Sequence, residues 1–283
     1  MSASTPQMDR ISENRPVNLG LRDRACVVTG ASRGIGRATA LVLAGEGAAL
    51  LLVGRREDTL EAVAAECRDA AIGGRAEVLA LDVTDRDAGE RVLETCQTRF
   101  GRIDALVNNA GTSFVRPLHE LTDGEWEEQW QLHVMAPMRL MRTLAPEMAK
   151  RGWGRIVNVC SSSGKRPSQT NVAYSVTKAA ELALSRAFAD AYASKGVLIN
   201  AVAPGPVADE LWLGPGGLAD QAARAQGTSR EKVLTDLAAR VPLGRLGTER
   251  EIAAVIAFLC AEAASNVAGA AWSADGGSVP VIL

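Results

Sequence analysis

Short apolar runs alternate along the chain with longer segments in which apolar residues recur every three or four positions. The short runs consist mostly of Val, Leu, Ile and Ala, as in buried strands, and the longer segments have the spacing of one face of an α-helix. We predict strands at Ala25–Thr29, Ala49–Val53, Val78–Leu81, Ala105–Val107, Ile156–Cys160, Leu198–Val202 and Ala270–Trp272. We predict helices at Ile35–Ala44, Glu57–Asp69, Arg86–Phe100, Glu125–Ala149, Ala173–Ser194 and Glu249–Cys260.

This alternation predicts an α/β fold built from βαβ units with parallel strands. Because the strand runs are continuously apolar, helices should cover both faces of the sheet. We therefore expect one Rossmann-type domain over residues 21–283, a doubly wound parallel sheet in three α/β/α layers. Residues 1–20 are polar and should form a flexible N-terminal tail. A segment of about residues 208–240 leaves the carboxyl end of a strand and is predicted to be a helical lid over the substrate.

The composition narrows the possible functions. Of the 283 residues, 47% are hydrophobic and 4% aromatic, so the core should be mainly aliphatic. The net charge of −2 gives no reason to expect nucleic acid or an anionic membrane as partner. Five scattered cysteines without a CxxC pair, and only two histidines, predict no metal site. We expect a cytoplasmic protein, since the sequence shows neither a secretory signal nor a run of about 18 apolar residues.

The first predicted strand and helix are joined by a glycine-rich segment, TGASRGIG at residues 29–36. Glycines at such a junction allow a tight turn and let the backbone approach a pyrophosphate at the helix N-terminus. A glycine-rich turn alone is weak evidence, but its place between a strand and a helix strengthens it. The residues predicted to bind a dinucleotide here are Gly30, Ser32, Arg33, Gly34, Ile35 and Gly36.

The residues after the second strand indicate which dinucleotide binds. A Rossmann enzyme that uses NAD places an acidic residue there, which bonds the ribose 2′-hydroxyl. This chain has Arg55 and Arg56 at that place, and Arg33 lies in the glycine turn. Guanidinium groups match a 2′-phosphate, so the sequence favours NADP(H). The alternative is that these arginines are only solvated surface charges.

Tyr174 and Lys178 are candidates for acid–base chemistry. They are four residues apart on a predicted helix, so both face the same side. A nearby ammonium favours the phenolate and lowers the pKa of a tyrosine, which is otherwise a poor acid or base at neutral pH. Ser161 follows a predicted strand and could bond the substrate oxygen, with Ser162 and Ser163 as alternatives. Alone this spacing is a weak motif, since most such pairs are ordinary helix surface.

Taken together, the motifs resemble those of the short-chain dehydrogenase/reductase family, in its short single-domain branch, and are similar to 3-oxoacyl-acyl-carrier-protein reductases. The resemblance runs from about residue 21 to residue 277, nearly the whole chain. The motifs are TGASRGIG at 29–36, LDV at 81–83, NNAG at 108–111, Ser161, YSVTK at 174–178, NAVAPGPV at 200–207 and DGG at 275–277.

The resemblance assigns a role to each of these segments. It implies that Tyr174 exchanges a proton with the substrate oxygen, Lys178 binds the nicotinamide ribose and tunes Tyr174, and Ser161 holds the substrate oxygen. Further contacts with the cofactor are implied for Asp82, Val83, Asn109, Ala110, Gly111, Pro204, Gly205 and Val207. It also implies a homodimer or homotetramer formed through helix–helix contacts.

Two positions depart from the family pattern. His133 stands where the family usually has an Asn that supports a chain of water molecules behind the lysine. A histidine could carry protons there itself, or it could be a buried residue with a satisfied ring. Asp209 stands where a Thr is usual, and its charge would repel the cofactor phosphates unless it points away or is paired.

These patterns lead us to predict an NADP(H)-dependent oxidoreductase that interconverts a ketone and a secondary alcohol, with Tyr174 as acid and base. The apolar residues Leu211, Trp212, Leu213 and Leu218 of the lid suggest an apolar, cyclic or acyl substrate. One alternative is a catalytically silent regulator that binds NADP(H). Another is an NAD-dependent alcohol dehydrogenase of the same family. Epimerases and dehydratases fit less well, since they usually have a TGxxGxxG turn and a larger C-terminal domain.

Overall fold

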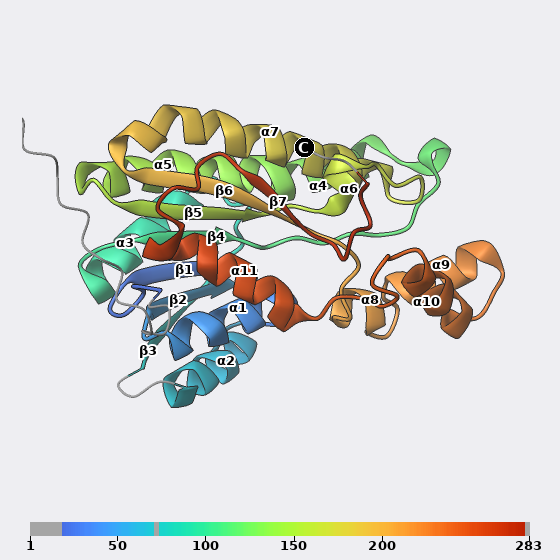
Figure 1. Cartoon of the computed structure of the whole chain (residues 1–283), viewed down its shortest axis with the longest axis horizontal. Helices are drawn as coiled ribbons and strands as arrows, with labels where there is room; N and C mark the ends of the chain where they lie inside the picture. Colours follow the sequence, from blue (N-terminus) through green and yellow to red (C-terminus); the bar gives the residue numbers. More distant parts are fainter. Residues whose placement is uncertain (1–18, 71–73, 281–283) are drawn as a thin grey trace, which may run out of the picture.

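The strands form one parallel sheet in the order β3-β2-β1-β4-β5-β6-β7 (Figure 1). The computed structural model describes residues 19–70 and 74–280. Within these ranges the strands are β1 (Ala25–Thr29), β2 (Ala49–Gly54), β3 (Arg75–Ala80), β4 (Ala105–Asn108), β5 (Gly154–Val159), β6 (Val197–Pro204) and β7 (Ala271–Ala274). All seven lie where the sequence predicts a strand, with the largest shift of a boundary at the start of β3.

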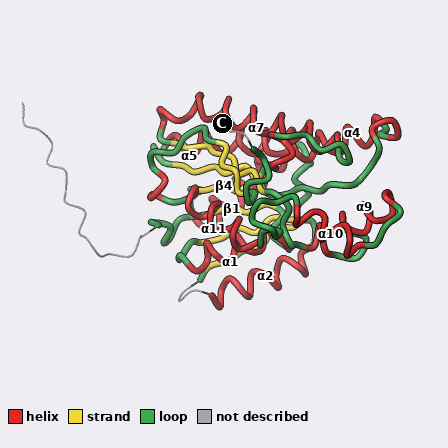
Figure 2. The backbone as a smooth tube through the Cα atoms, turned by 45° about the vertical axis from the view of Figure 1, so that its right-hand side comes forward, coloured by secondary structure: helices red, strands yellow, loops and turns green. Residues whose placement is uncertain are grey.

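Helices cover both faces of the sheet, as Figures 1 and 2 show. On one face lie α1 (Gly34–Gly45), α2 (Glu57–Ala70) and α11 (Glu249–Cys260). On the other lie α3 (Ala88–Phe100), α5 (Ala136–Lys150) and α7 (Val172–Tyr192). The predicted fold class, a doubly wound parallel sheet in three layers, is therefore confirmed.

The strands are apolar on both sides because each side faces a helical layer. In β1, Cys26 and Val28 pack into the cluster that includes α1 and α11, whereas Val27 packs into the cluster with α3 and α5. Leu50 and Leu51 of β2 divide between the two clusters in the same way. The sequence predicted that helices cover both faces of the sheet because the strands are continuously apolar. The two separate cores explain this pattern.

The long helix predicted at Glu125–Ala149 consists of three parts. These are α4 (Asp123–Trp130), a π-helical turn η2 (Gln131–Met135) and α5. The start is earlier than predicted because Thr122 caps α4, with its hydroxyl accepting from Glu125 N at 3.2 Å. The π turn has a local cause, since Pro137 has no N–H to donate to the carbonyl four residues earlier.

The segment predicted as a lid is helical and projects from the carboxyl edge of the sheet (Figure 1). It contains α8 (Glu210–Leu213), α9 (Leu218–Gln226) and α10 (Arg230–Ala239). Leu218, expected to meet the substrate, is 4% exposed and packs inside the protein, whereas Leu211 and Trp212 are half-buried. The segment predicted as a lid therefore exposes fewer apolar side chains than its sequence suggests.

The predicted N-terminal tail falls mostly outside the described residues. Of residues 1–20, only Leu19 and Gly20 belong to the described part. Leu19 packs against the apolar core, and its carbonyl accepts a hydrogen bond from Glu262 N at 2.9 Å. The last two residues of the predicted tail are therefore part of the folded domain.

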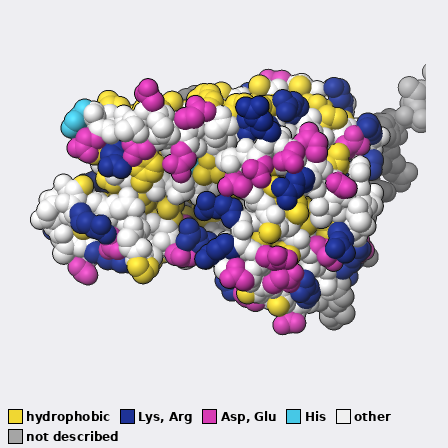
Figure 3. Space-filling model, turned by 180° about the vertical axis from the view of Figure 1, so that it is seen from behind, with side chains coloured by type: hydrophobic (Ala, Val, Ile, Leu, Met, Phe, Trp, Pro, Cys, Tyr) yellow, Lys and Arg dark blue, Asp and Glu magenta, His cyan; other side chains and the backbone are white. Residues whose placement is uncertain are grey.

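Acidic and basic side chains are interspersed over the face drawn in Figure 3, where they form no large patch of one sign. This agrees with the small net charge of −2. In the same view, the part of the chain that holds the lid helices forms a lobe of its own. Among the described residues, none of the helices combines the length and apolar character that a membrane crossing requires.

The five cysteines are reduced and buried: Cys26, Cys67, Cys96, Cys160 and Cys260. Burial raises the pKa of each thiol, to about 11 for Cys67 and to about 12 for Cys96 and Cys260. A thiol in such surroundings stays protonated and packs as a small apolar group.

The buried carboxylate of Asp104 is predicted to stabilise the amino-terminal edge of the sheet, and this can be tested. Its fully buried carboxylate accepts hydrogen bonds from Ala25 N at 2.9 Å and from Arg102 at 2.6 Å. We expect Asp104→Ala to lower the free energy of unfolding by about 1–3 kcal/mol, because the Ala25 N–H is left buried without an acceptor. Asp104→Asn keeps an acceptor and should lose less. Equal losses in denaturant unfolding would contradict this explanation.

Candidate active site

Most of the segments predicted to bind cofactor and substrate follow the carboxyl ends of strands. Because the strands are parallel, these ends share one edge of the sheet, and the structure brings the segments together there (Figure 1). The segments are the glycine turn after β1, Arg55 and Arg56 after β2, Asp82 and Val83 after β3, Asn109 to Gly111 after β4, Ser161 after β5, and Gly205 to Val207 after β6. This edge is the candidate active site.

The glycine turn requires its glycines. Gly30 and Gly34 have φ values of 64° and 59°, in the left-handed region that glycine adopts without strain. A Cβ on Gly36 would collide with the carbonyl oxygen of Gly30. The helix α1 begins at Gly34, with Ser32 and Arg33 just before it and Ile35 in its first turn. The backbone can thus lie close to a pyrophosphate placed at the start of this helix.

Asn109 closes the turn from the side of β4. Its side-chain Nδ2 donates to Thr29 O at 2.9 Å and to Gly30 O at 3.2 Å. The backbone N–H groups of Asn109 and Ala110 donate to the hydroxyl of Thr29 at 2.9 and 3.1 Å. Asn109 therefore holds the two central strands together beneath the place predicted for the cofactor.

The segment after β6 is packed closely against the segment after β7. A Cβ on Gly205 would lie 2.8 Å from the Cα of Asp275, so a side chain does not fit there. The Gly247 backbone N–H donates to Pro206 O at 2.9 Å, and Ala208 N donates to Gly247 O at 2.8 Å. Val207 is buried. The segment from Pro204 to Val207 is thus held at the edge from two sides.

The three arginines predicted to bind a 2′-phosphate are exposed at one corner of the site. Arg33 forms an ion pair with Glu210 of the lid at 2.7 Å. Burial would raise the pKa of Asp82, but hydrogen bonds from Thr84 and the charge of Arg55 lower it below its usual value. Arg55 therefore lies close enough to Asp82 to affect it, as expected for two residues at the end of neighbouring strands.

Asp209, which replaces the Thr usual in the family, caps a helix. Its carboxylate accepts a hydrogen bond from Trp212 N at 3.1 Å at the start of α8. Burial raises its pKa, which the hydrogen bonds from backbone N–H groups partly oppose. An added Cβ on Gly34 would lie 3.8 Å from Asp209 Oδ2, so this carboxyl group lies beside the start of α1.

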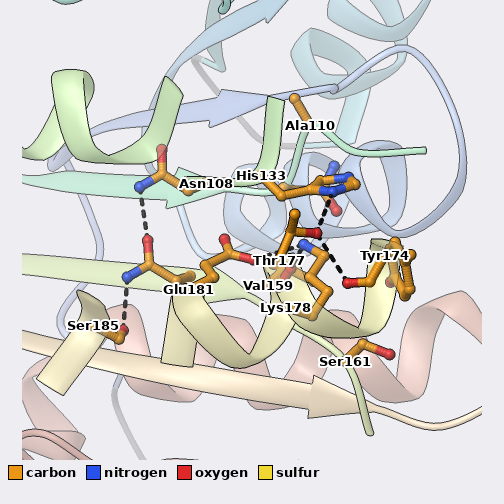
Figure 4. Close-up of polar contacts among 12 residues, drawn as sticks. Asn108, Ala110, His133, Val159, Ser161, Tyr174, Thr177, Lys178, Glu181 and Ser185 are labelled. Atoms are coloured by element: carbon orange, nitrogen blue, oxygen red, sulfur yellow. Dashed lines mark hydrogen bonds and ion pairs between the residues drawn. The ribbon is translucent and has the colours of Figure 1, made fainter. Parts of the chain in front are cut away.

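Tyr174, Ser161 and Lys178 lie together where β5 and α7 meet the edge (Figure 4). Ser161 is the N-cap of the short helix α6 (Ser162–Lys165), with its hydroxyl accepting from Ser163 N at 3.1 Å. Tyr174 lies in the first turn of α7, one turn before Lys178. Burial raises the pKa of Tyr174, whereas the ammonium of Lys178 and a hydrogen bond with Ser161 act to lower it.

Lys178 is buried, and its ammonium has two partners inside the protein. It donates to Val159 O at 2.9 Å and to Glu181 Oε2 at 2.7 Å. Glu181 is 2% exposed and was not among the residues predicted from the sequence. Its position three residues after Lys178 on one helix was the available signal, since residues at that spacing share a face.

His133 lies in the π turn and is 1% exposed. Its Nε2 accepts a hydrogen bond from Thr112 N at 3.2 Å, so the proton of a neutral ring is on Nδ1, which lies 3.1 Å from Thr177 Oγ1. Thr177 in turn donates to Tyr174 O at 2.9 Å. The imidazole also meets the Tyr174 ring edge to face, with centroids 5.3 Å apart. Both ring nitrogens of His133 are therefore hydrogen-bonded within the protein.

A narrow pocket lies against Tyr174, between α4 and the start of α7. Apolar side chains of Phe114, Leu121 and Val172 line it together with the polar side chains of Arg116 and Gln129. The carboxamide of Gln129 is buried and has no hydrogen-bond partner among the described residues. The space between these side chains is too narrow for a water molecule, so the pocket is closed in this structure.

Lys165 and Arg166 follow Ser161 along the chain, and they face different surroundings. Lys165 donates to Ala271 O at 2.6 Å and to the hydroxyl of Ser273 at 2.9 Å. It therefore ties α6 to the edge strand β7, whereas the side chain of Arg166 is exposed. Neither arrangement requires an anionic ligand.

His133 should affect stability more than the pH dependence of catalysis. Burial and the charge of Lys178 hold its pKa well below 6.5 in the folded protein. The unfolded chain then binds a proton below about pH 6.5 that the folded protein does not, so stability falls with decreasing pH by up to about 1.4 kcal/mol per pH unit.

We expect His133→Asn to remove this contribution to the pH dependence of unfolding between about pH 7 and pH 5. The shape of the pH–rate profile should stay unchanged. His119→Asn is the matched control, because the only other histidine is exposed. Loss of an inflection near neutral pH in the rate profile of His133→Asn would instead make His133 a proton carrier.

The comparisons with known proteins agree with this geometry. The short chain dehydrogenase family matches residues 24–212. The 3-oxoacyl-[acyl-carrier-protein] reductase FabG of Thermotoga maritima is 32% identical over 265 residues, 92% of this chain and 99% of that protein. The cis-4-hydroxycyclohexanecarboxylate dehydrogenase of Sinomonas cyclohexanicum is 37% identical over 260 residues, 92% of this chain and 98% of that protein.

Solved structures give the same result. L-Sorbose reductase from Gluconobacter frateurii, in complex with NADPH and L-sorbose, has a TM-score of 0.87 at 32% identity and covers 94% of this chain and 100% of its own. Levodione reductase has a TM-score of 0.86 at 30% identity, with 92% of this chain and 99% of its own covered. With its sequence motifs, its sheet and its site at the carboxyl edge, the chain belongs to the short-chain dehydrogenase/reductase family.

Proposed function

We propose that the protein is an NADP(H)-dependent oxidoreductase that interconverts a ketone and a secondary alcohol, with Tyr174 as the acid and base. The observation that carries this proposal is the position of the Tyr174 phenol between the hydroxyl of Ser161 and the buried ammonium of Lys178, at the edge where the cofactor segments meet. A phenol in such surroundings can give up and regain a proton.

In the direction of reduction, Tyr174 donates its phenolic proton to the oxygen of the carbonyl group as negative charge develops there. The hydroxyl of Ser161 bonds the same oxygen, and the ammonium of Lys178 stabilises the phenolate that remains. NADP(H), when bound, supplies or accepts the hydride. In the direction of oxidation, the phenolate of Tyr174 takes the proton of the alcohol.

The residues at the edge fit NADP(H). The glycine turn leaves no room for a Cβ at Gly36, and the backbone of Gly34 begins a helix that favours a pyrophosphate. Arg33, Arg55 and Arg56 suit a 2′-phosphate. The L-sorbose reductase with TM-score 0.87 was crystallised with NADPH, and this supports the same cofactor here.

The proposed substrate class is supported mainly by the relatives, and by the residues that line the closed pocket beside Tyr174. Apolar side chains dominate its lining, which favours an apolar or cyclic body. Relatives named for cis-4-hydroxycyclohexanecarboxylate, levodione and 3-oxoacyl carrier protein support a cyclic or acyl carbonyl compound. Residues 208–240 are proposed to cover this substrate, and the homodimer or homotetramer implied by the family stays a prediction.

Tyr174→Phe tests the chemistry. The variant keeps the ring but lacks the proton donor, so turnover should fall by about 100- to 10,000-fold while NADPH still binds. Tyr192→Phe is the matched control, because it changes the only other tyrosine, at the far end of the same helix. NADPH oxidation with a panel of ketones measures both. Activity of Tyr174→Phe close to the wild type would refute the mechanism, and a wild type that binds NADPH but reduces nothing would favour the silent regulator.

Arg55→Glu tests the choice of cofactor. Loss of charge-assisted bonds to the 2′-phosphate should weaken NADPH binding by about 10- to 150-fold and leave NADH binding nearly unchanged. Arg22→Glu, which changes an exposed arginine before the amino end of β1, is the control for net charge. Fluorescence titration with both nucleotides gives the dissociation constants. A wild type that prefers NADH would favour the NAD-dependent alternative.

A further inference from the structure

We propose that Glu181 is a positioning residue, the buried counter-ion of Lys178 that offsets the effect of the ammonium on Tyr174 and so favours the protonated phenol. The site would then be set for carbonyl reduction, and alcohol oxidation would require alkaline conditions. The direction of catalysis rests on the proposed function, whereas the effect of Glu181 on the phenol does not.

The geometry places the three groups in one row along α7. Tyr174, Lys178 and Glu181 share the face of the helix that points toward β5 (Figure 4). The Lys178 ammonium lies 2.7 Å from Glu181 Oε2, and the two side chains are 4% and 3% exposed. The same ammonium lies 5.7 Å from the centroid of the Tyr174 ring. The positive charge that acts on the phenol therefore has a negative charge directly behind it.

A buried carboxylate is stable only when it is paired and hydrogen-bonded. Burial raises the pKa of Glu181, and the ammonium of Lys178 and a hydrogen bond from the thiol of Cys160 oppose this and favour the carboxylate. Burial by itself would lower the pKa of Lys178, but the attraction of Glu181 outweighs it and raises that pKa. The lysine thus stays an ammonium throughout the neutral range, and the pair presents little net charge to its surroundings.

The consequence for Tyr174 follows from the signs of its neighbours. Burial raises the pKa of the phenol, Lys178 lowers it, and the charge of Glu181 raises it again, with a smaller contribution of the same sign from Cys160. The net result is a pKa above the usual value near 10. Without Glu181, burial would still oppose the ammonium, but the pKa of Tyr174 would be lower than it is with the carboxylate present.

The other titratable groups around this row do not reverse this sign. From η2, His133 faces Tyr174, but burial and Lys178 hold its pKa well below 6.5 and the ring is neutral. Directly after β5, Cys160 has a pKa raised by burial and is a neutral thiol. Lys165 acts on Cys160 from α6, but its ammonium is directed to Ala271 O and Ser273 of β7.

A phenol that remains protonated at neutral pH is the form that reduction needs, because the carbonyl oxygen must receive a proton. Oxidation needs the phenolate, which the carboxylate of Glu181 disfavours. Glu181 thus moves the pH range of oxidation upward through its effect on the phenol.

The chain allows a direct measurement, because it contains only two tyrosines. In a Tyr192→Phe background, Tyr174 is the single tyrosine, and the absorbance of its phenolate during an alkaline titration reports its pKa without cofactor or substrate. Glu181→Gln keeps an acceptor for Lys178 and removes the charge. We expect the titration midpoint of Tyr174 to move to lower pH by about one pH unit in this variant.

Two further variants separate charge from structure. Glu181→Asp retains the carboxylate and should titrate close to the wild type. Asp190→Asn removes a carboxylate from the same helix, where it pairs with Arg186 at the surface, and should have no effect. Thermal unfolding shows which variants fold. If Glu181→Gln does not fold, Glu181→Met removes the same charge without leaving a polar group to satisfy, and the same shift is expected.

The pH profiles of kcat/KM give the functional readout. In Glu181→Gln, alcohol oxidation at pH 7–8 should rise by about tenfold, since one pH unit in the midpoint changes the phenolate fraction by that factor. Ketone reduction at pH 7 should change far less. An unchanged or higher titration midpoint in a folded Gln or Met variant would overturn the role of Glu181. A shifted midpoint in a protein that reduces no ketone would support Glu181 and refute the proposed function instead.

Discussion

A parallel sheet places the carboxyl ends of all its strands at one edge, and the site depends on this constraint. The chain winds from β1 toward β3 on one side and then returns to place β4 on the other side of β1. The connections after β1 and β4 therefore leave toward opposite faces, and a crevice opens between them. The glycine turn and Asn109 lie at this point. Residues from six strands meet there although they are spread over most of the sequence.

The rotation of α7 about its own axis decides what this edge can do. The helix turns a polar face toward the sheet, and hydrogen bonds fix that face at several positions along the helix. Lys178 pairs with Glu181 and donates to Val159 O of β5, while Ser185 accepts from Asn158 Nδ2 at 2.7 Å. Asn158 also accepts from Asn108 Nδ2 at 2.7 Å. Polar groups in a core are costly unless paired, so one rotation of α7 is strongly preferred, and it presents Tyr174 at the edge.

Most of the fold could be predicted because it is encoded in local periodicity, and β1 and α11 have the predicted bounds. What the sequence did not reveal depends on burial or on distant contacts. A glutamate on a helix is usually a surface residue, so the sequence alone gives no reason to expect that Glu181 is buried and paired with Lys178. The π turn comes from a missing N–H at Pro137, too local an effect for a periodic pattern. The pairing of Arg33 with Glu210 joins residues 177 positions apart.

The distribution of the cysteines has a practical consequence. Three of them, Cys26, Cys67 and Cys260, lie in the core on the side of α1, and Cys96 lies in the core on the side of α3. In the folded protein a thiol reagent does not react with them, because each sulfur atom is buried and each thiol is protonated. The native cysteines can therefore report on both helical layers. Under mild denaturation, the order in which their thiols react would show which layer unfolds first.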